Sequence, residues 1–409
     1  MSKVKNFLKK VAPGLITGGA DNDPAGISTY SIAGAQFGYS LNWLMILATP
    51  MLIAVQAMCA RLGDVQRKGL AKIIKENYHP VIALISTFIL IICNVVTIGA
   101  DLAGISAAMG LITHTSYLLW ILPFSFLILY IVIFKNFKTI EKFLLLLVLP
   151  FLSYIFAGIL AKPDWGIVFK ETFMPSIKWI PAYFAAAIGA MGTTITPYLF
   201  FWQTKGEVEA KVSEQQHLKE AKNEDLLLAP GFIFSQIITL FIMIATGTVL
   251  FSNGIKDINS AAEAAKALEP FAGPYAQLLF AVGIIGAGLL AIPVLASSTA
   301  YVFAETMGWR DSLSDKVSQA KGFYAVLTLS VLIGVVIAFI NINPIKALFY
   351  SQILAGMLGP FLLILILLLC NKKEVMGKYV NGWFDNLFGW LAVIIMLLST
   401  AVFLWQVIR

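Results

Sequence analysis

The chain has 409 residues, of which 59% are hydrophobic and only 12% are charged, and its mean hydropathy is +0.84. Soluble domains carry about 25% charged residues, so this composition excludes a soluble enzyme or nucleic-acid-binding domain and indicates an integral membrane protein. The net charge of +7 then indicates a basic excess in cytoplasmic loops.

Eleven apolar segments are long enough to cross a bilayer as helices. An odd number of crossings places the two ends of the chain on opposite sides of the membrane. The first ten residues are basic, but no small-residue cleavage site follows them, so we expect no removable signal peptide. The segments lie at roughly 11–36, 42–62, 80–111, 117–134, 143–161, 180–204, 227–251, 272–306, 322–340, 344–370 and 385–408.

The distribution of basic residues predicts the orientation. Of the 29 Lys and Arg residues, 22 fall at the N-terminus and in every second loop, and 7 fall in the other loops and at the C-terminus. Because positive residues stay on the cytoplasmic side, we expect a cytoplasmic N-terminus and an external C-terminus. The short loops and the lack of a signal fit a prokaryotic inner membrane.

The first segment carries acidic residues and helix breakers at the same depth. Asp21, Asn22 and Asp23 lie near its middle, and Pro24 and Gly26 follow. A carboxylate near the bilayer centre usually faces a cavity on an ion or substrate path, and proline and glycine interrupt helices. We therefore expect a broken helix at Asp23, with Asp21 either attracting cations or capping a half-helix. The alternative is a kinked packing helix whose acids are satisfied by neighbours.

A second interruption lies in the sixth segment. Gly192, Thr193, Thr194, Thr196 and Pro197 interrupt its apolar run. The first and sixth segments correspond in an inverted repeat of five plus five helices, and paired interruptions at corresponding positions indicate a transporter site. We expect the threonines to form a polar wall facing the first break, although a single membrane threonine often bonds only to its own helix.

Other polar features are expected to be peripheral. The charged stretch 205–226 is expected to form a solvated cytoplasmic helix, and residues 256–269 are expected to form a short external helix. Glu305 is expected to be solvated near a helix end. The cysteines lie in apolar runs without metal-ligand spacing, and the histidines lie at helix ends or in a loop. These residues are Cys59, Cys93, Cys370, His79, His114 and His217.

These motifs resemble the NRAMP family of divalent-metal transporters. Residues 23–26 (DPAG) stand where the family has D-P-G-N, and 33–43 (AGAQFGYSLNW) match the segment that follows it. Residues 101–103 (DLA) stand where the family has D-L-A-E, and 351–352 (SQ) where it has Ser-Gln. The resemblance covers nearly the whole chain.

The resemblance implies an all-α membrane protein with the LeuT-type fold, in which the first and sixth of eleven helices are broken. Its two inverted repeats would span about 11–161 and 180–370, with an extra helix at 385–408. It also implies transport by alternating access, in which the substrate site opens to one side of the membrane at a time.

The chain departs from the main family at several positions. The metal-binding asparagine of the family falls on Gly26, and its metal-binding methionine falls on Thr193. Two family histidines and the third-helix glutamate are replaced by Ile195, Phe200 and Gly104. This pattern resembles the divergent NRAMP-related magnesium transporters, in which the soft ligand and the proton-relay groups are lost.

The candidate metal site is therefore expected to present only oxygen donors. Carboxylate, hydroxyl, carbonyl and water suit Mg²⁺ and Mn²⁺, whereas methionine sulfur suits transition metals. Because Mg²⁺ keeps several waters, the small residues at the replaced positions leave room for a hydrated ion. Asp101 is expected to be a structural partner of the first helix rather than a residual proton relay. The candidate site residues are Asp23, Gly26, Ala190, Thr193, Thr194, Gln352 and Asp21.

The predicted function is transport of divalent metal ions, with a preference for Mg²⁺ and some transport of Mn²⁺, without proton coupling. The alternatives are a proton-coupled Mn²⁺/Fe²⁺ transporter of the main NRAMP type and an organic-solute symporter, against which Asp23 argues because it would repel a substrate carboxylate. No catalytic triad, zinc-spaced cluster or phosphate loop occurs, so we expect neither an enzyme nor a cofactor. The expected partners are the transported ion and the lipid bilayer, without nucleic acid or an obligate protein partner.

Overall fold

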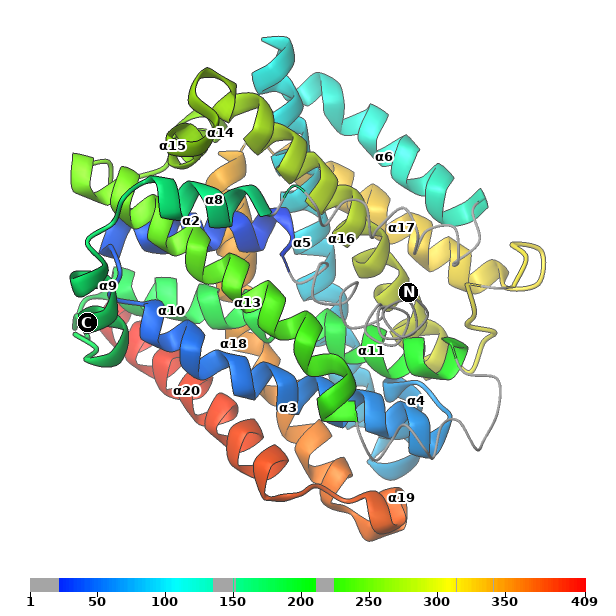
Figure 1. The fold of residues 1–409 in the computed structure, drawn as a ribbon. Helices are drawn as coiled ribbons and strands as arrows, with labels where there is room; N and C mark the ends of the chain where they lie inside the picture. Colours follow the sequence, from blue (N-terminus) through cyan, green and yellow to red (C-terminus); the bar gives the residue numbers. More distant parts are fainter. Residues whose placement is uncertain (1–21, 135–149, 151, 211–223, 314, 341) are drawn as a thin grey trace, which may run out of the picture.

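The computed structural model describes residues 22–134, 150, 152–210, 224–313, 315–340 and 342–409. Figure 1 shows this part of the chain as a bundle of helices, and no strand occurs in it. Eight spans are long and apolar enough to cross a membrane, or nine if one bent pair of helices counts as a span. Each of the eleven predicted segments contains a described helix, as the predicted all-α membrane fold requires.

The first half of the chain contributes seven described helices. Two of them, α2 and α5, begin at proline, whose fixed φ and missing N–H suit the first helical position. Residues 11–21 of the first predicted segment lie outside the described part. The helices are α2 Pro24–Phe37, α3 Asn42–Gln66, α4 Leu70–Asn77, α5 Pro80–Thr113, α6 Leu118–Phe134, α8 Leu152–Leu160 and α9 Trp165–Phe173.

The second half contains the predicted interruption of the sixth segment. One helix ends at Thr194 and the next begins at Pro197, as expected. The predicted external helix at 256–269 is found as two short helices, α14 and α15. The helices are α10 Pro181–Thr194, α11 Pro197–Ala210, α13 Glu224–Val249, α14 Ala261–Ala265, α15 Glu269–Ala272, α16 Ala276–Met307, α17 Lys321–Ala338, α18 Pro344–Asn371, α19 Lys373–Met376 and α20 Trp383–Ile408.

The helix α5 is central to the packing, because it contacts α2, α16, α17 and α18. On the opposite side of α2, the helix α13 packs against both α2 and α3. Figure 1 shows the extra helix α20 along one edge of the bundle, where it contacts α3, α10 and α18. A buried ion pair fastens this edge: Arg61 Nη1 of α3 lies 2.8 Å from Asp385 Oδ2 of α20.

The helix α9 was not predicted from the sequence. It follows α8 after a bend of 117° and has only nine residues. Trp165, Phe169 and Phe173 along it are exposed, and the last two rings are stacked. Exposed aromatic side chains on a short helix beside a span are typical of a helix that lies at the membrane surface.

The expectation that Glu305 is solvated was wrong. Its side chain is 2% exposed, and its Oε1 lies 3.4 Å from Lys205 Nζ of α11. The same nitrogen lies 2.6 Å from Asp311 Oδ2, and the amide of Lys72 in α4 donates to Glu305 Oε2 at 3.3 Å. The predicted solvated helix at 205–226 was also wrong at its start, because Lys205 and Glu207 are buried in α11; residues 211–223 lie outside the described part.

We expect Lys205→Met to destabilise the protein by about 3 kcal/mol, because removing one member of a buried ion pair leaves the other charge buried. The matched control is Lys68→Met, since Lys68 lies 2.7 Å from Glu76 in a pair whose side chains are 37% and 39% exposed. Exposed pairs contribute about 0–1 kcal/mol. Melting curves of the detergent-purified variants measure the difference, and equal losses for the two lysines would contradict the expectation.

Candidate metal site

Asp23 occupies the start of a helix inside the membrane-spanning bundle. It is 2% exposed and is the N-cap of α2, with φ −70° and ψ 171°. Its Oδ1 accepts a hydrogen bond from the amide of Gly26 at 2.5 Å. This bond satisfies one of the amides that every helix leaves free at its first turn, so Gly26 holds the carboxylate through its backbone.

A second carboxylate reaches the same helix turn from α5. Asp101 is fully buried, and its Oδ1 accepts from the amide of Ala25 at 3.2 Å. This contact agrees with the predicted structural role of Asp101 beside the first helix. Its other oxygen, Oδ2, has no hydrogen-bond partner among the described residues. Asp101 and Asp23 accept from the adjacent amides of Ala25 and Gly26, so two acidic groups meet at the positive end of α2.

The end of α10 provides hydroxyl groups. Thr194 Oγ1 donates to the carbonyl of Ala190 at 2.8 Å and is bonded to Tyr30 Oη of α2, also at 2.8 Å. Thr193 is 1% exposed, and its hydroxyl has no partner among the described residues. Thr194 is thus linked both to its own helix and to Tyr30 of α2, which the sequence did not single out, whereas the polar wall facing Asp23 stays a prediction.

A sulfur atom also lies beside this break. Met45 Sδ of α3 lies 3.8 Å from Thr194 Oγ1. Thioethers are soft ligands, so the surroundings of the break are not made of oxygen alone, although the predicted site residues themselves offer oxygen atoms.

Gln352 lies against the end of α10. A Cβ added to Gly192 would overlap the carbonyl oxygen of Gln352 and the amide of Gly356, so α10 and α18 touch backbone to backbone. Gln352 is 1% exposed; its Nε2 donates to Ser351 Oγ at 3.2 Å, and its Oε1 has no partner among the described residues. The backbone of Gln352 thus contacts Gly192, the residue before Thr193, and sequence reasoning missed this glycine contact.

The structure joins the predicted residues pairwise across four helices. Asp23 and Gly26 lie in the first turn of α2 beside Asp101, and Tyr30 links α2 to Thr194. Within the described part, no three His, Cys, Asp or Glu side chains are grouped closely enough to hold a metal ion. Any ion here would therefore rely on one or two carboxylates completed by hydroxyl, amide, carbonyl or water oxygens, as Mg²⁺ does. Asp21 lies outside the described residues.

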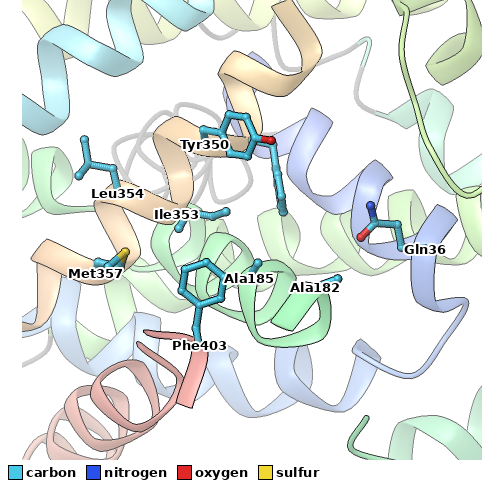
Figure 2. Close-up of a pocket in the computed structure, with 9 residues that line it drawn as sticks. Gln36, Ala182, Ala185, Tyr350, Ile353, Leu354, Met357 and Phe403 are labelled. Atoms are coloured by element: carbon cyan, nitrogen blue, oxygen red, sulfur yellow. The ribbon is translucent and has the colours of Figure 1, made fainter. Parts of the chain in front are cut away.

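Two described histidines and one described cavity do not contribute to this site. His79 and His114 are exposed at helix ends, as predicted, and His217 lies outside the described part. Figure 2 shows a cavity of about 420 Å³ between α2, α10, α18 and α20, with Gln36, Tyr350 and Phe403 on its walls. None of its nine lining residues is charged, so it is not suited to a dication.

Comparison with known proteins identifies the family. A family model described as natural resistance-associated macrophage protein-like (Nramp) matches residues 14–406. The chain belongs to the Nramp family. The predicted family is therefore confirmed, whereas the likeness to its magnesium-transporting branch stays a prediction.

Relatives in the Nramp family are named as metal transporters. The divalent metal cation transporter MntH of Caldanaerobacter subterraneus is 26% identical, over 100% of this chain and 95% of that protein. MntH of Deinococcus radiodurans is 25% identical, over 99% of this chain and 91% of that protein. These names describe transporters rather than enzymes.

Solved structures show the fold. The Eremococcus coleocola manganese transporter has a TM-score of 0.81 at 18% identity, over 98% of this chain and 86% of that one. The structure of MhsT in complex with L-phenylalanine has a TM-score of 0.66 at 13% identity, over 96% of this chain and 98% of that one. The predicted transporter fold is confirmed by this likeness.

We expect Gly192→Ala to destabilise the protein by about 1–3 kcal/mol, because the added methyl group would overpack the contact between α10 and α18. Gly206→Ala in α11 is the matched control, since a Cβ there meets nothing within 4 Å and alanine favours a helix. Melting curves of the two purified variants test this, and a Gly192 variant as stable as the Gly206 variant would show that the contact is not tight.

Proposed function

We propose that this Nramp-family protein transports divalent metal ions and prefers Mg²⁺ over transition metals, with Mn²⁺ as a second substrate. The observation that carries the proposal is the set of donor groups at the start of α2 and the end of α10. Asp23 supplies a carboxylate, and Thr193 offers a buried hydroxyl where the family resemblance places a methionine sulfur. Hard oxygen donors suit Mg²⁺, and they give transition metals no advantage.

The proposed transport is uncoupled from protons. The positions at which the resemblance expects proton-relay histidines hold Ile195 and Phe200, which are both fully buried. Asp101 is bonded to the amide of Ala25 rather than to a titratable side chain in the bonds seen here. The membrane potential can supply the driving force instead, since it contributes roughly 2.3 kcal/mol per charge per 100 mV, and this doubles for a divalent ion.

The proposal includes the arrangement of the chain in the membrane. The two inverted repeats would span about 11–161 and 180–370, and an extra helix would span 385–408. The N-terminus would lie in the cytoplasm and the C-terminus outside. The distribution of the 29 basic residues supports this orientation. Bacterial relatives support a prokaryotic cell membrane.

A second candidate is a proton-coupled transporter of Mn²⁺ or Fe²⁺. The observation that favours it is the thioether of Met45, which lies 3.8 Å from Thr194 Oγ1 beside the break. This candidate predicts that metal entry acidifies the interior of proteoliposomes, whereas the uncoupled Mg²⁺ transporter leaves the internal pH unchanged.

We expect purified protein in proteoliposomes to take up Mg²⁺ in a metal panel of Mg²⁺, Mn²⁺, Ca²⁺ and Fe²⁺, with an internal pH dye present. Asp23→Ala and the isosteric Asp23→Asn should both reduce uptake at least tenfold, because they remove the charge that replaces part of the hydration shell of the ion. Full uptake by Asp23→Asn, or acidification that requires Mg²⁺ entry, would refute the proposal.

We expect Thr193→Met to shift the preference toward Mn²⁺ and Fe²⁺, because it adds a soft sulfur donor. Thr193→Val is the matched control, since it removes the hydroxyl without adding sulfur and breaks no hydrogen bond to a described residue. Competition of Mn²⁺ against Mg²⁺ uptake measures the shift. If the valine and methionine variants have the same preference, the side chain at 193 does not contact the ion.

A further inference from the structure

Asn22, the residue before Asp23, is fastened to a helix that contributes none of the candidate ligands. Its Nδ2 donates to Ser235 Oγ at 2.7 Å, and its Oδ1 accepts from Thr239 Oγ1 at 3.3 Å. Asn22 is 1% exposed, and both partners are fully buried. Ser235 and Thr239 are four residues apart in α13, so they lie on the same face of that helix.

The hydrogen bonds of Asn22 affect the position of Asp23, because the two residues are consecutive in the chain. Asp23 has an extended backbone, with φ −70° and ψ 171°, and α2 begins at the next residue. Its carboxylate is held on one side by the amide of Gly26. On the other side, the position of its backbone depends on Asn22, whose side chain uses both ends of its amide on α13.

We propose that Ser235 and Thr239 are positioning residues that act through Asn22 to hold the Asp23 carboxylate in its ion-binding position. The inference rests on the proposed function, since it assigns Asp23 to the transported ion. Displacing a ligand by a fraction of an ångström weakens binding of an ion that demands near-ideal geometry, as Mg²⁺ does. Ser235 and Thr239 therefore set the affinity for the ion without touching it.

A merely structural tie between α2 and α13 is the competing explanation. The two segments are also joined away from Asp23: Tyr39, just after α2, bonds through its Oη to Thr248 Oγ1 at 2.8 Å. Gly34 of α2 lies so close to Thr246 that an added Cβ would overlap its hydroxyl. These contacts hold the same two helices together, so they provide an internal comparison for the Asn22 contacts.

The test compares hydroxyl losses at the two ends of this helix pair. Ser235→Ala/Thr239→Val removes the two α13 hydroxyl groups that bond the Asn22 side chain, and we expect the apparent KM for Mg²⁺ uptake to rise about five- to tenfold, as for the loss of one or two buried hydrogen bonds. The maximal rate should change less than twofold. Thr248→Val removes the Tyr39 contact instead and should leave KM unchanged, and Thr239→Ser, which keeps the hydroxyl, should also resemble wild type.

The outcomes separate this inference from the proposed function. A KM for the double variant within twofold of wild type, or an equal rise for Thr248→Val, overturns the positioning role. If size-exclusion chromatography shows that the double variant does not fold, Ser235→Ala alone is measured against the same criterion. If wild type carries another divalent cation instead of Mg²⁺, KM is measured with that ion. If wild type carries none, both proposals fall.

Discussion

The structure depends on how one helix begins inside the membrane. Every helix leaves its first amides without intrahelical partners, and the hydrocarbon contains no water to satisfy them. In α2 the amides of Ala25 and Gly26 donate to Asp101 and Asp23, and Pro24 has no amide hydrogen to satisfy. The carboxylates also lie at the positive end of the helix dipole. The buried helix start and the buried acids therefore stabilise each other.

The charges at this helix start differ from the other buried charges described above. Arg61 lies against Asp385, and Lys205 lies against Glu305 and Asp311, so in these clusters a cation offsets the acid. Asp23 and Asp101 instead receive backbone amides, which stabilise a carboxylate without cancelling its charge. In the proposed function, the carboxylate of Asp23 attracts the cation at this helix start, and the backbone amides hold it in place without offsetting its charge.

Features that depend on local sequence could be predicted, and features that depend on distant partners could not. The helix start at Pro24 and the break at Pro197 follow from what proline does to its own helix turn, so both were predicted within a residue or two. Glu305 was expected to be a solvated residue at a helix end, because the sequence around it gives no sign of its partner Lys205, which is distant in the chain. The helix α9 was missed because its nine residues are too short for a search based on bilayer-spanning length. The hydrogen bonds from Asn22 to α13 likewise join residues that are distant in the sequence, so they could not be predicted from it.

The unpartnered oxygens around the breaks favour an ion that keeps part of its water. Asp101 Oδ2, Thr193 Oγ1 and Gln352 Oε1 come from α5, α10 and α18, and each is buried without a hydrogen-bond partner among the described residues. Such groups destabilise a fold by about 1–3 kcal/mol each, so they persist where a function uses them. In the proposed function, the water molecules kept on a hydrated dication would donate to such acceptors, whereas a bare ion would have to contact them directly. The proposed preference for Mg²⁺, whose strong hydration opposes binding at a site of direct ligands, is consistent with these open acceptors.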